Sequence, residues 1–206
     1  MSRREPPVLL AMAGTLLALS GLQPHDRLTW LLEVAPVLIG VPILVATHKS
    51  FPLTPLAYRL VLLHATILML GGHYTYAEVP LGAWLQSALG LARNHYDRVG
   101  HFAQGFVPAI LTREILVRCS PLRPGAWLFT LVTAVVLALS ATYELTEWWT
   151  ALLFGAAAEA FLGTQGDPWD TQWDMFLALA GGLIAQTLLG RLHDRQLTQW
   201  GLVASR

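Results

Sequence analysis

Residues 126–152 read AWLFTLVTAVVLALSATYELTEWWTAL, an apolar run that is long enough to cross a membrane. No charged residue occurs between Ala126 and Tyr143, after which Glu144 and Glu147 follow close together. About 20 predominantly apolar residues cross a bilayer as an α-helix. The run therefore predicts a transmembrane helix that carries two acidic residues near one end.

The rest of the chain has the same character. Of its 206 residues, 54% are hydrophobic and only 13% are charged, whereas soluble proteins average about 25% charged residues. Acidic and basic residues are equal in number, so the net charge is zero and a nucleic-acid partner is not expected. The single cysteine, Cys119, excludes a disulfide framework. This composition indicates a protein whose main partner is the lipid bilayer.

Five further stretches are apolar enough to form membrane helices: residues 8–22, 28–47, 57–77, 95–117 and 168–192. Residues 79–91 and 154–161 are apolar but too short to cross, so we expect them to lie at the interface or to re-enter the membrane. The sequence therefore predicts an all-α polytopic bundle of about six transmembrane helices. We expect residues 1–206 to form a single integral membrane domain.

Basic residues predict the orientation, because positively charged loops stay in the cytoplasm. With six spans, both chain ends lie on one side of the membrane. That side would hold Arg3, Arg4, Lys49, Arg59, Arg113, Arg118, Arg123, Arg191, Arg195 and Arg206, and the other side Arg27, Arg93 and Arg98. Both termini are therefore predicted to be cytoplasmic.

The first apolar stretch has a second interpretation. Arg3 and Arg4 before a short apolar run resemble a signal peptide, and residues 18–20 (Ala-Leu-Ser) resemble its cleavage site. We expect a retained helix, with a cleaved signal peptide as the alternative.

Three predicted helices each carry two ionisable residues at the predicted outer end. Residues three or four positions apart share one face of a helix. This spacing relates Asp97 to His101, Glu144 to Glu147, and Asp170 to Asp174. Ionisable groups at membrane depth are unfavourable unless they are paired or hydrated. Their recurrence at one depth therefore indicates a shared site.

Imidazoles and carboxylates from several helices are suitable ligands for Zn²⁺ or Mn²⁺. A metal held in this way activates water and cleaves an ester or phosphoester. The candidate catalytic residues and ligands are Asp97, His101, Glu144, Asp170 and Asp174, and the wider metal-binding set adds His95, Glu147 and Asp167.

Simpler interpretations stay open at several of these positions. Asp97 has the adjacent Arg98 as a possible ion-pair partner, and Asp167 has the spacing of an N-cap for a helix that begins at Pro168. Without a metal, His101 beside Asp97 could serve as a general base or proton relay. The remaining histidines receive no functional role. We expect His64 to be packed within its helix and His73 to be exposed at the membrane interface. Loop positions are expected for His25, His48 and His193.

Three motifs resemble the YjdF-type bacterial inner-membrane proteins. They are NHYDRVGHFAQGFVPAILTRE over residues 94–114, YELTEWWTA from Tyr143, and FLGTQGDPWDTQWDM from Phe161. The resemblance covers most of the chain. It implies a multi-pass protein of the bacterial inner membrane.

A more distant likeness is to VanZ-like proteins, whose pattern is roughly D-K-x-x-H-F, then E-x-x-Q, then D-x-x-x-N-x-x-G. The residues at these positions are Asp97, Arg98, His101 and Phe102 for the first element, Glu144 and Glu147 for the second, and Asp174, Ala178 and Gly181 for the third. This likeness implies a role at the cell envelope.

Three functions are compatible with these features. The leading hypothesis is a site on the extracytoplasmic side for a divalent cation or for a lipid or envelope head group, with metal-dependent hydrolysis as its specific form. A proton- or cation-coupled transporter is the first alternative, supported by Pro36 and Pro42 within one apolar span. A non-catalytic envelope scaffold, with the ionisable clusters joining the helices, is the second.

Overall fold

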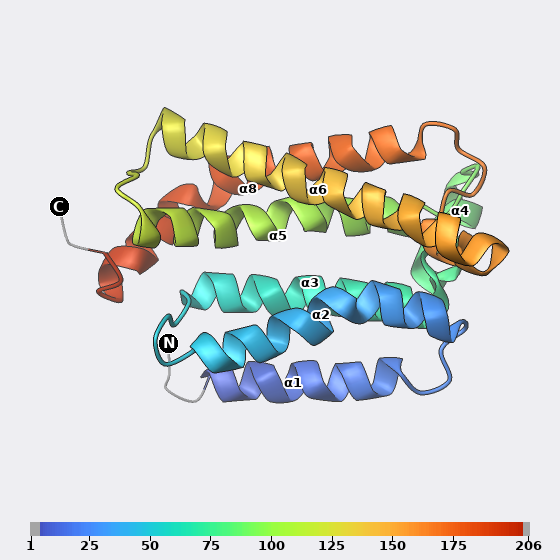
Figure 1. Cartoon of the computed structure of the whole chain (residues 1–206), viewed down its shortest axis with the longest axis horizontal. Coiled ribbons are helices and arrows are strands. Elements are labelled where there is room, and N and C mark those ends of the chain that lie inside the picture. Colours follow the sequence, from blue (N-terminus) through green and yellow to red (C-terminus); the bar gives the residue numbers. More distant parts are fainter. Residues whose placement is uncertain (1–4, 204–206) are drawn as a thin grey trace.

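The structure is a computed structural model that describes residues 5–203, except for the side chains of residues 156, 157 and 159. In this range, six long helices run along one axis (Figure 1). Their bounds are α1 (Glu5–Ser20), α2 (Arg27–Thr47), α3 (Pro55–Tyr74), α5 (Tyr96–Cys119), α6 (Ala126–Phe154) and α8 (Asp170–Gln199). Short helices in the connections are η1 (Tyr76–Glu78), α4 (Pro80–Leu89), η2 (Gly155–Ala158) and α7 (Glu159–Leu162). The predicted all-α fold is confirmed.

Four of these helices, α2, α3, α6 and α8, are long and apolar enough to cross a membrane. Helix α1 is apolar but has only 16 residues. Helix α5 has 24 residues and includes charged ones, of which Asp97, Arg113 and Glu114 are buried. It packs mainly against α8 and also contacts α3 and α6, so these three charges face other helices. The chain is therefore a polytopic helical membrane protein.

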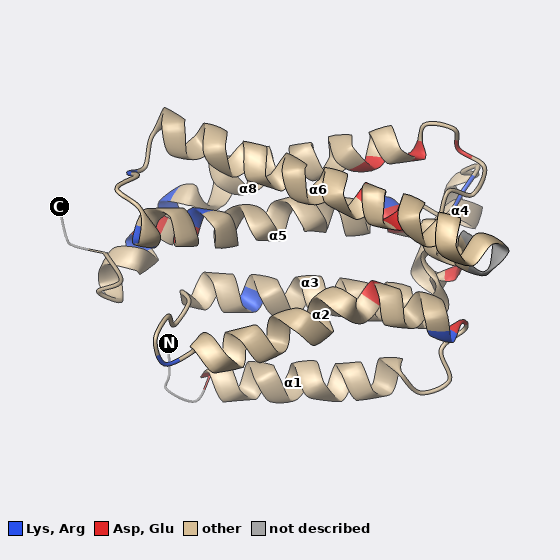
Figure 2. Cartoon of the chain, viewed as in Figure 1, with Lys and Arg blue, Asp and Glu red and all other residues tan. Residues whose placement is uncertain are grey.

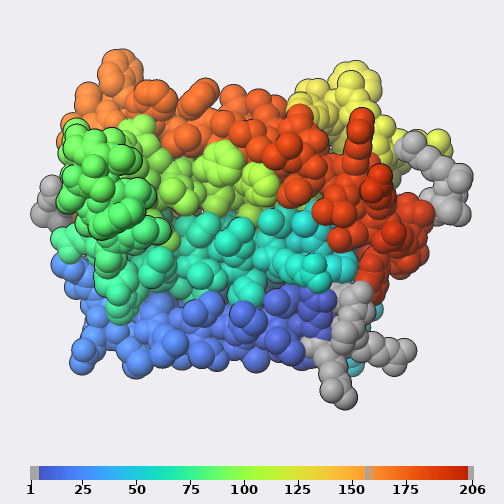
Figure 3. All heavy atoms as spheres, turned by 180° about the vertical axis from the view of Figure 1, so that it is seen from behind, coloured from blue at the N-terminus to red at the C-terminus, as the bar shows by residue number. Residues whose placement is uncertain are grey.

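The long helices form two groups that meet along α3 and α5. Helices α1, α2 and α3 make one group, and α5, α6 and α8 make the other (Figure 1). Seen from behind, α1 and α8 lie at opposite edges with α3 and α5 between them (Figure 3). Val107, Ile110 and Val132 are among the fully buried residues of the core between α5, α6 and α8. This second group carries most of the predicted site residues.

Glycines bring α5 and α8 into backbone contact. A Cβ atom on Gly105 would overlap the carbonyl oxygen of Ala178, and one on Gly181 would overlap that of Phe102. Small residues let membrane helices approach this closely. The middle of the α5–α8 seam is therefore closed by packed backbone.

The two ends of the bundle differ in charge. Helix α1 begins and α8 ends at one end (Figure 1), where most of the Lys and Arg residues gather, and most Asp and Glu residues lie toward the other (Figure 2). We call the first, which holds Arg113 and Arg118, the basic end, and the second, which holds Asp97 and Asp170, the acidic end. Arg3, Arg4 and Arg206 lie outside the described residues, as does the proposed signal-peptide start. The side of the membrane that each end faces stays a prediction.

Helix α4 lies at the acidic end (Figure 1). It has 10 residues, too few to cross a bilayer, and Leu81, Trp84, Leu85 and Leu89 are exposed on it. A short helix with an exposed apolar face suits the membrane interface. The interfacial position of residues 79–91 stays a prediction, which this short apolar helix supports.

The start of α2 provides a test of local stability. Asp26 is the N-cap, and its Oδ1 accepts a hydrogen bond of 2.7 Å from the Thr29 backbone N–H. This bond lowers the pKa of Asp26. The stabilisation is therefore present above the ordinary aspartate pKa and is lost as the pH falls through the lowered pKa. We expect Asp26→Ala to reduce the free energy of unfolding by about 1 kcal/mol at neutral pH, measured by thermal unfolding in detergent.

The control is Asp26→Asn, because asparagine also caps helices well. It should retain most of the stability at neutral pH and lose the acid dependence of this position. Equal destabilisation by alanine and asparagine would contradict a capping role.

Candidate functional site

The candidate site surrounds His101 at the acidic end. His101 lies on α5 and is 6% exposed. Its Nε2 is 3.3 Å from Asp97 Oδ1 and 3.8 Å from Asp174 Oδ2. Its Nδ1 is 3.0 Å from Gln104 Oε1 and 3.8 Å from Glu144 Oε1. One buried imidazole thus faces carboxylates from α5, α6 and α8, the three helices that the sequence assigned to the site.

Two groups of potential metal ligands share this histidine. His101, Asp97 and Asp174 each offer one ligand atom, and these atoms lie within 4.8 Å of one another. His101, Glu144 and Glu147 meet the same criterion. Within each of the two groups the side chains are therefore close enough to hold one ion.

Two carboxylate oxygens here are buried without a hydrogen-bond partner among the residues that the structure describes. They are Glu144 Oε1 and Asp174 Oδ1. A buried ionised oxygen without a partner is strongly unfavourable, so a cation or a proton must balance these groups. Zn²⁺ and Mn²⁺ accept mixed imidazole and carboxylate ligands. The Gln104 contact on the other ring nitrogen is typical of a partner that orients a ligating histidine.

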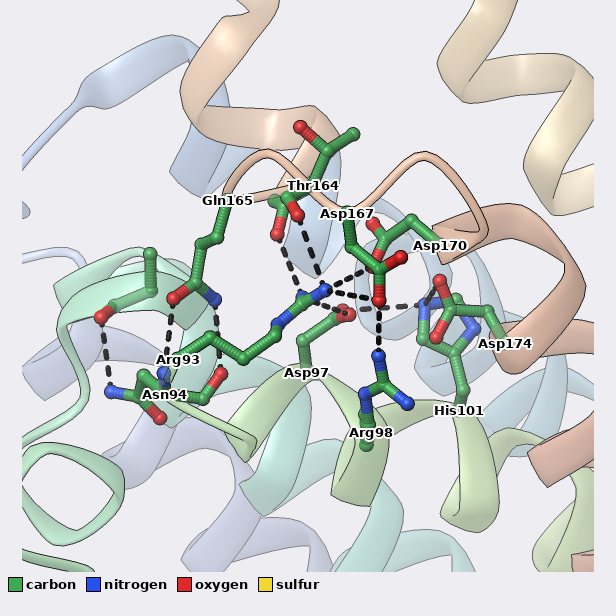
Figure 4. A network of polar contacts seen from close by, with 12 residues as sticks. Arg93, Asn94, Asp97, Arg98, His101, Thr164, Gln165, Asp167, Asp170 and Asp174 are labelled. Atoms are coloured by element: carbon green, nitrogen blue, oxygen red, sulfur yellow. Dashed lines mark hydrogen bonds and ion pairs between the residues drawn. The ribbon is translucent and has the colours of Figure 1, made fainter. Parts of the chain in front are cut away.

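The other predicted acids are held by arginines (Figure 4). Asp170 forms an ion pair with Arg93, and Asp167 Oδ2 lies 2.7 Å from Arg98 Nη2. Arg93 Nη2 is also 3.4 Å from Asp97 Oδ2. Asp97 therefore joins two groups, with one oxygen facing His101 and the other facing Arg93. The pair considered between Asp97 and Arg98 does not form, because Arg98 reaches Asp167 instead.

Asp167 is not the N-cap of α8, which begins at Asp170. Its Oδ1 accepts a hydrogen bond of 2.9 Å from the Trp169 backbone N–H. That bond, with Arg98 beside it, lowers the pKa of Asp167, so this carboxylate is ionised at neutral pH. Arg98 in turn lies 5.1 Å from the centre of the Trp173 ring. Asp167 thus orders the loop before α8 instead of capping the helix.

Two loops are joined beside the site (Figure 4). Gln165 Oε1 accepts a hydrogen bond from the Asn94 backbone N–H at 3.0 Å, and Gln165 Nε2 donates to Asn94 O at 2.9 Å. The Asn94 side chain also donates to the carbonyl oxygens of Ala77 and Val79. The segments before α4, α5 and α8 are thereby tied together at the acidic end.

His95 precedes α5 and is half-buried, and burial lowers its pKa. It belongs to neither of the two ligand groups found in the described chain.

Glu33 was not assigned to the site, yet it is 4% exposed and accepts a hydrogen bond of 3.1 Å from Tyr143 Oη. The Tyr143 ring packs against His101. An acid inside an apolar span was the signal that could have identified Glu33.

A second buried polar cluster lies at the basic end. Glu114 Oε2 accepts hydrogen bonds from Thr54 Oγ1 at 2.7 Å and from His193 Nε2 at 3.0 Å. Its Oε1 pairs with Arg118 at 2.9 Å. His193 is fully buried within α8, so the expectation of a loop position was wrong. The predicted helix ended at residue 192 because the apolar run stops there, whereas α8 continues to Gln199.

The neighbours of His193 show which of its ring nitrogens donates and which accepts. Arg113 Nη1 lies 3.0 Å from His193 Nδ1, and an arginine can only donate. Nδ1 therefore accepts, and Nε2–H donates to Glu114. Arg113 Nη2 also pairs with Asp194 at 2.8 Å. These groups satisfy one another, which indicates that the cluster joins helices.

Comparison with known proteins agrees with the fold and the motifs. The profile of a family described as "Predicted membrane protein (DUF2238)" matches residues 6–195. The chain is 53% identical over 207 residues to the inner membrane protein YjdF of Escherichia coli (strain K12), a match that covers 98% of this chain and 99% of that protein. No solved structure matches significantly. The resemblance to YjdF-type proteins is confirmed, and that to VanZ-like proteins stays a hypothesis. The chain belongs to the DUF2238 family of predicted membrane proteins and is an inner-membrane protein.

Proposed function

We propose that this protein binds a divalent cation, Zn²⁺ or Mn²⁺, at the acidic end through His101, Asp97 and Asp174. Glu144 and Glu147 form with His101 the second group of potential ligands, which borders this ion. The observation that carries this proposal is a buried histidine among carboxylates from three helices. Two of these carboxylates, Glu144 and Asp174, each have an oxygen without a hydrogen-bond partner in the described part of the chain. A bound cation would satisfy the Asp174 oxygen, which belongs to the same ligand group as His101 and Asp97.

The charge distribution favours an extracytoplasmic position for this site. Most Lys and Arg residues lie at the opposite end of the bundle (Figure 2), and positively charged loops stay in the cytoplasm. The substrate would then be a lipid or an envelope component that reaches the outer face of the inner membrane.

The specific form of the proposal is metal-dependent hydrolysis of such a substrate. A divalent ion supplies a nucleophilic water near neutral pH and polarises the ester or phosphoester oxygen. Glu147 is half-buried, and we assign it the exchange of protons with the substrate. Asp167 and Asp170 are held by Arg98 and Arg93, and we assign them a positioning role.

Two observations support a cation site over a transport route and over a phosphate head group. A transport route along α5 and α8 would have to pass the backbone contacts at Gly105 and Gly181. A phosphate head group would need a free cationic side chain, whereas Arg93 is already enclosed by Asp97, Asp170 and neighbouring carbonyls.

The test is the metal content of the detergent-purified protein, measured by elemental mass spectrometry. Wild-type protein should carry near-stoichiometric Zn²⁺ or Mn²⁺, and the Asp97→Ala, His101→Ala double variant should lose it because two of the three main ligands are gone. Asp194→Asn, which alters an α8 acid at the basic end, should keep the metal.

A folded wild-type protein that binds neither ion after resupply would refute the proposal. If the metal is present, a screen of lipid esters and phosphoesters then tests the hydrolytic form, and activity that survives in the double variant would argue against it.

A further inference from the structure

Arg93 is enclosed by oxygen atoms as a bound metal cation would be (Figure 4). The residue is 7% exposed. Its two terminal nitrogens face three carboxylates and two main-chain carbonyls: those of Asp97, Asp167 and Asp170, and those of Gly163 and Thr164. Carboxylate and carbonyl oxygens are the ligands that Ca²⁺ takes in proteins, and Mn²⁺ accepts them too.

The fit of the guanidinium to this pocket is incomplete. Arg93 Nε is buried and has no hydrogen-bond partner within the described residues. An arginine that is held as a planar fork uses several donors at once, whereas here all acceptors gather around the two terminal nitrogens. The oxygens are therefore arranged around one centre of positive charge.

This centre lies next to the proposed metal site. Asp97 contributes Oδ2 to Arg93 and Oδ1 to His101, so one carboxylate connects both positions. A divalent ion placed among the same oxygens would meet the guanidinium at contact distance, and like charges this close repel each other strongly away from water. The guanidinium therefore disfavours a divalent ion on its own side of Asp97 and leaves the His101 side free.

We propose that Arg93 is the resident cation of a second, oxygen-lined position, and that it limits the acidic end to one exchangeable divalent ion. Only the part of this inference that concerns the exchangeable ion at His101 rests on the proposed function. The oxygen-lined position, which lacks a histidine, would otherwise take Ca²⁺, so Arg93 is a residue that sets both the number and the kind of ion bound.

The experiment replaces the resident cation. Wild-type, Arg93→Ala and Arg98→Ala proteins are purified in detergent and stripped with a chelator, and thermal unfolding and bound Ca²⁺ are measured with and without millimolar Ca²⁺. Arg93→Ala should unfold at a lower temperature than wild type, and Ca²⁺ should restore the midpoint and bind near-stoichiometrically.

Arg98→Ala is the matched control, since it also removes an arginine from Asp167 but leaves Arg93 in place. It should gain no Ca²⁺, like wild type. Adding Asp170→Asn to Arg93→Ala should abolish the gain, because a carboxylate ligand is lost.

An Arg93→Ala protein that gains no Ca²⁺, whether it stays folded or unfolds in its presence, would overturn the inference. So would a wild-type protein that binds Ca²⁺ stoichiometrically while Arg93 is present. A wild-type protein without Zn²⁺ or Mn²⁺, beside an Arg93→Ala variant that binds Ca²⁺, would end the proposed function and support this inference.

Discussion

Gly105→Leu is expected to abolish folding of the bundle or to reduce its free energy of unfolding by more than about 3 kcal/mol, the upper end of ordinary overpacking. A side chain at Gly105 meets the backbone of α8 at Ala178, and backbone cannot move aside as a flexible side chain can. The measurement is the fraction of monodisperse protein after detergent extraction, together with its thermal unfolding midpoint.

Gly40→Leu is the matched control, because Gly40 also lies within a long helix and a Cβ atom there meets no described atom within 4 Å. It should leave the fold intact. Similar behaviour of the two variants would contradict the close approach of α5 and α8. The result bears on the site as well, since Asp97 and His101 face Asp174 only when these two helices are in contact.

Glu114→Ala should be the second severe change, with a loss of about 3–5 kcal/mol, as is typical when one partner of a buried ion pair is removed. Glu114 is 0% exposed, and its removal leaves Arg118, His193 and Thr54 without their shared acceptor. Thermal unfolding in detergent measures the effect.

Asp194→Asn provides the comparison at the same end of the bundle. Its side chain is 36% exposed and pairs with the buried Arg113. Because Arg113 keeps His193 as a second partner and asparagine can still accept a hydrogen bond, we expect a smaller loss than for Glu114→Ala. A Glu114→Ala variant that is no less stable than Asp194→Asn would show that the cluster does not hold α3, α5 and α8 together.

The parts of the site that were predicted are those that depend on spacing within one helix. Asp97 with His101, and Glu144 with Glu147, share a face because a helix repeats every 3.6 residues. The structure brings both pairs together around one imidazole. The pairings with Arg93 were not predicted, since Arg93 lies in a loop and meets Asp170 only after α5 and α8 have packed.

The same distinction applies to errors at helix ends. The predicted start of the last helix at Pro168 was two residues too early, because the Asp167 side chain serves a turn before Asp170. Its predicted end was too early as well. His193 and Leu197 continue the buried face of α8, but the polar His193 interrupts the apolar run from which the helix end was predicted. A polar residue near a helix end looks like a loop residue until its partner on another helix is known.

Apolar length and charge were sufficient to predict the all-α class, the approximate spans and the residues gathered at the acidic end, because insertion into a bilayer depends on local hydrophobicity. The structure was needed to show which carboxylates face His101 and which face Arg93, and that Glu33 and the Glu114–His193 pair join separate helices. Such contacts depend on which helix faces lie together and at what depth, and in α5 and α8 the close backbone approach at Gly105 and Gly181 sets that alignment.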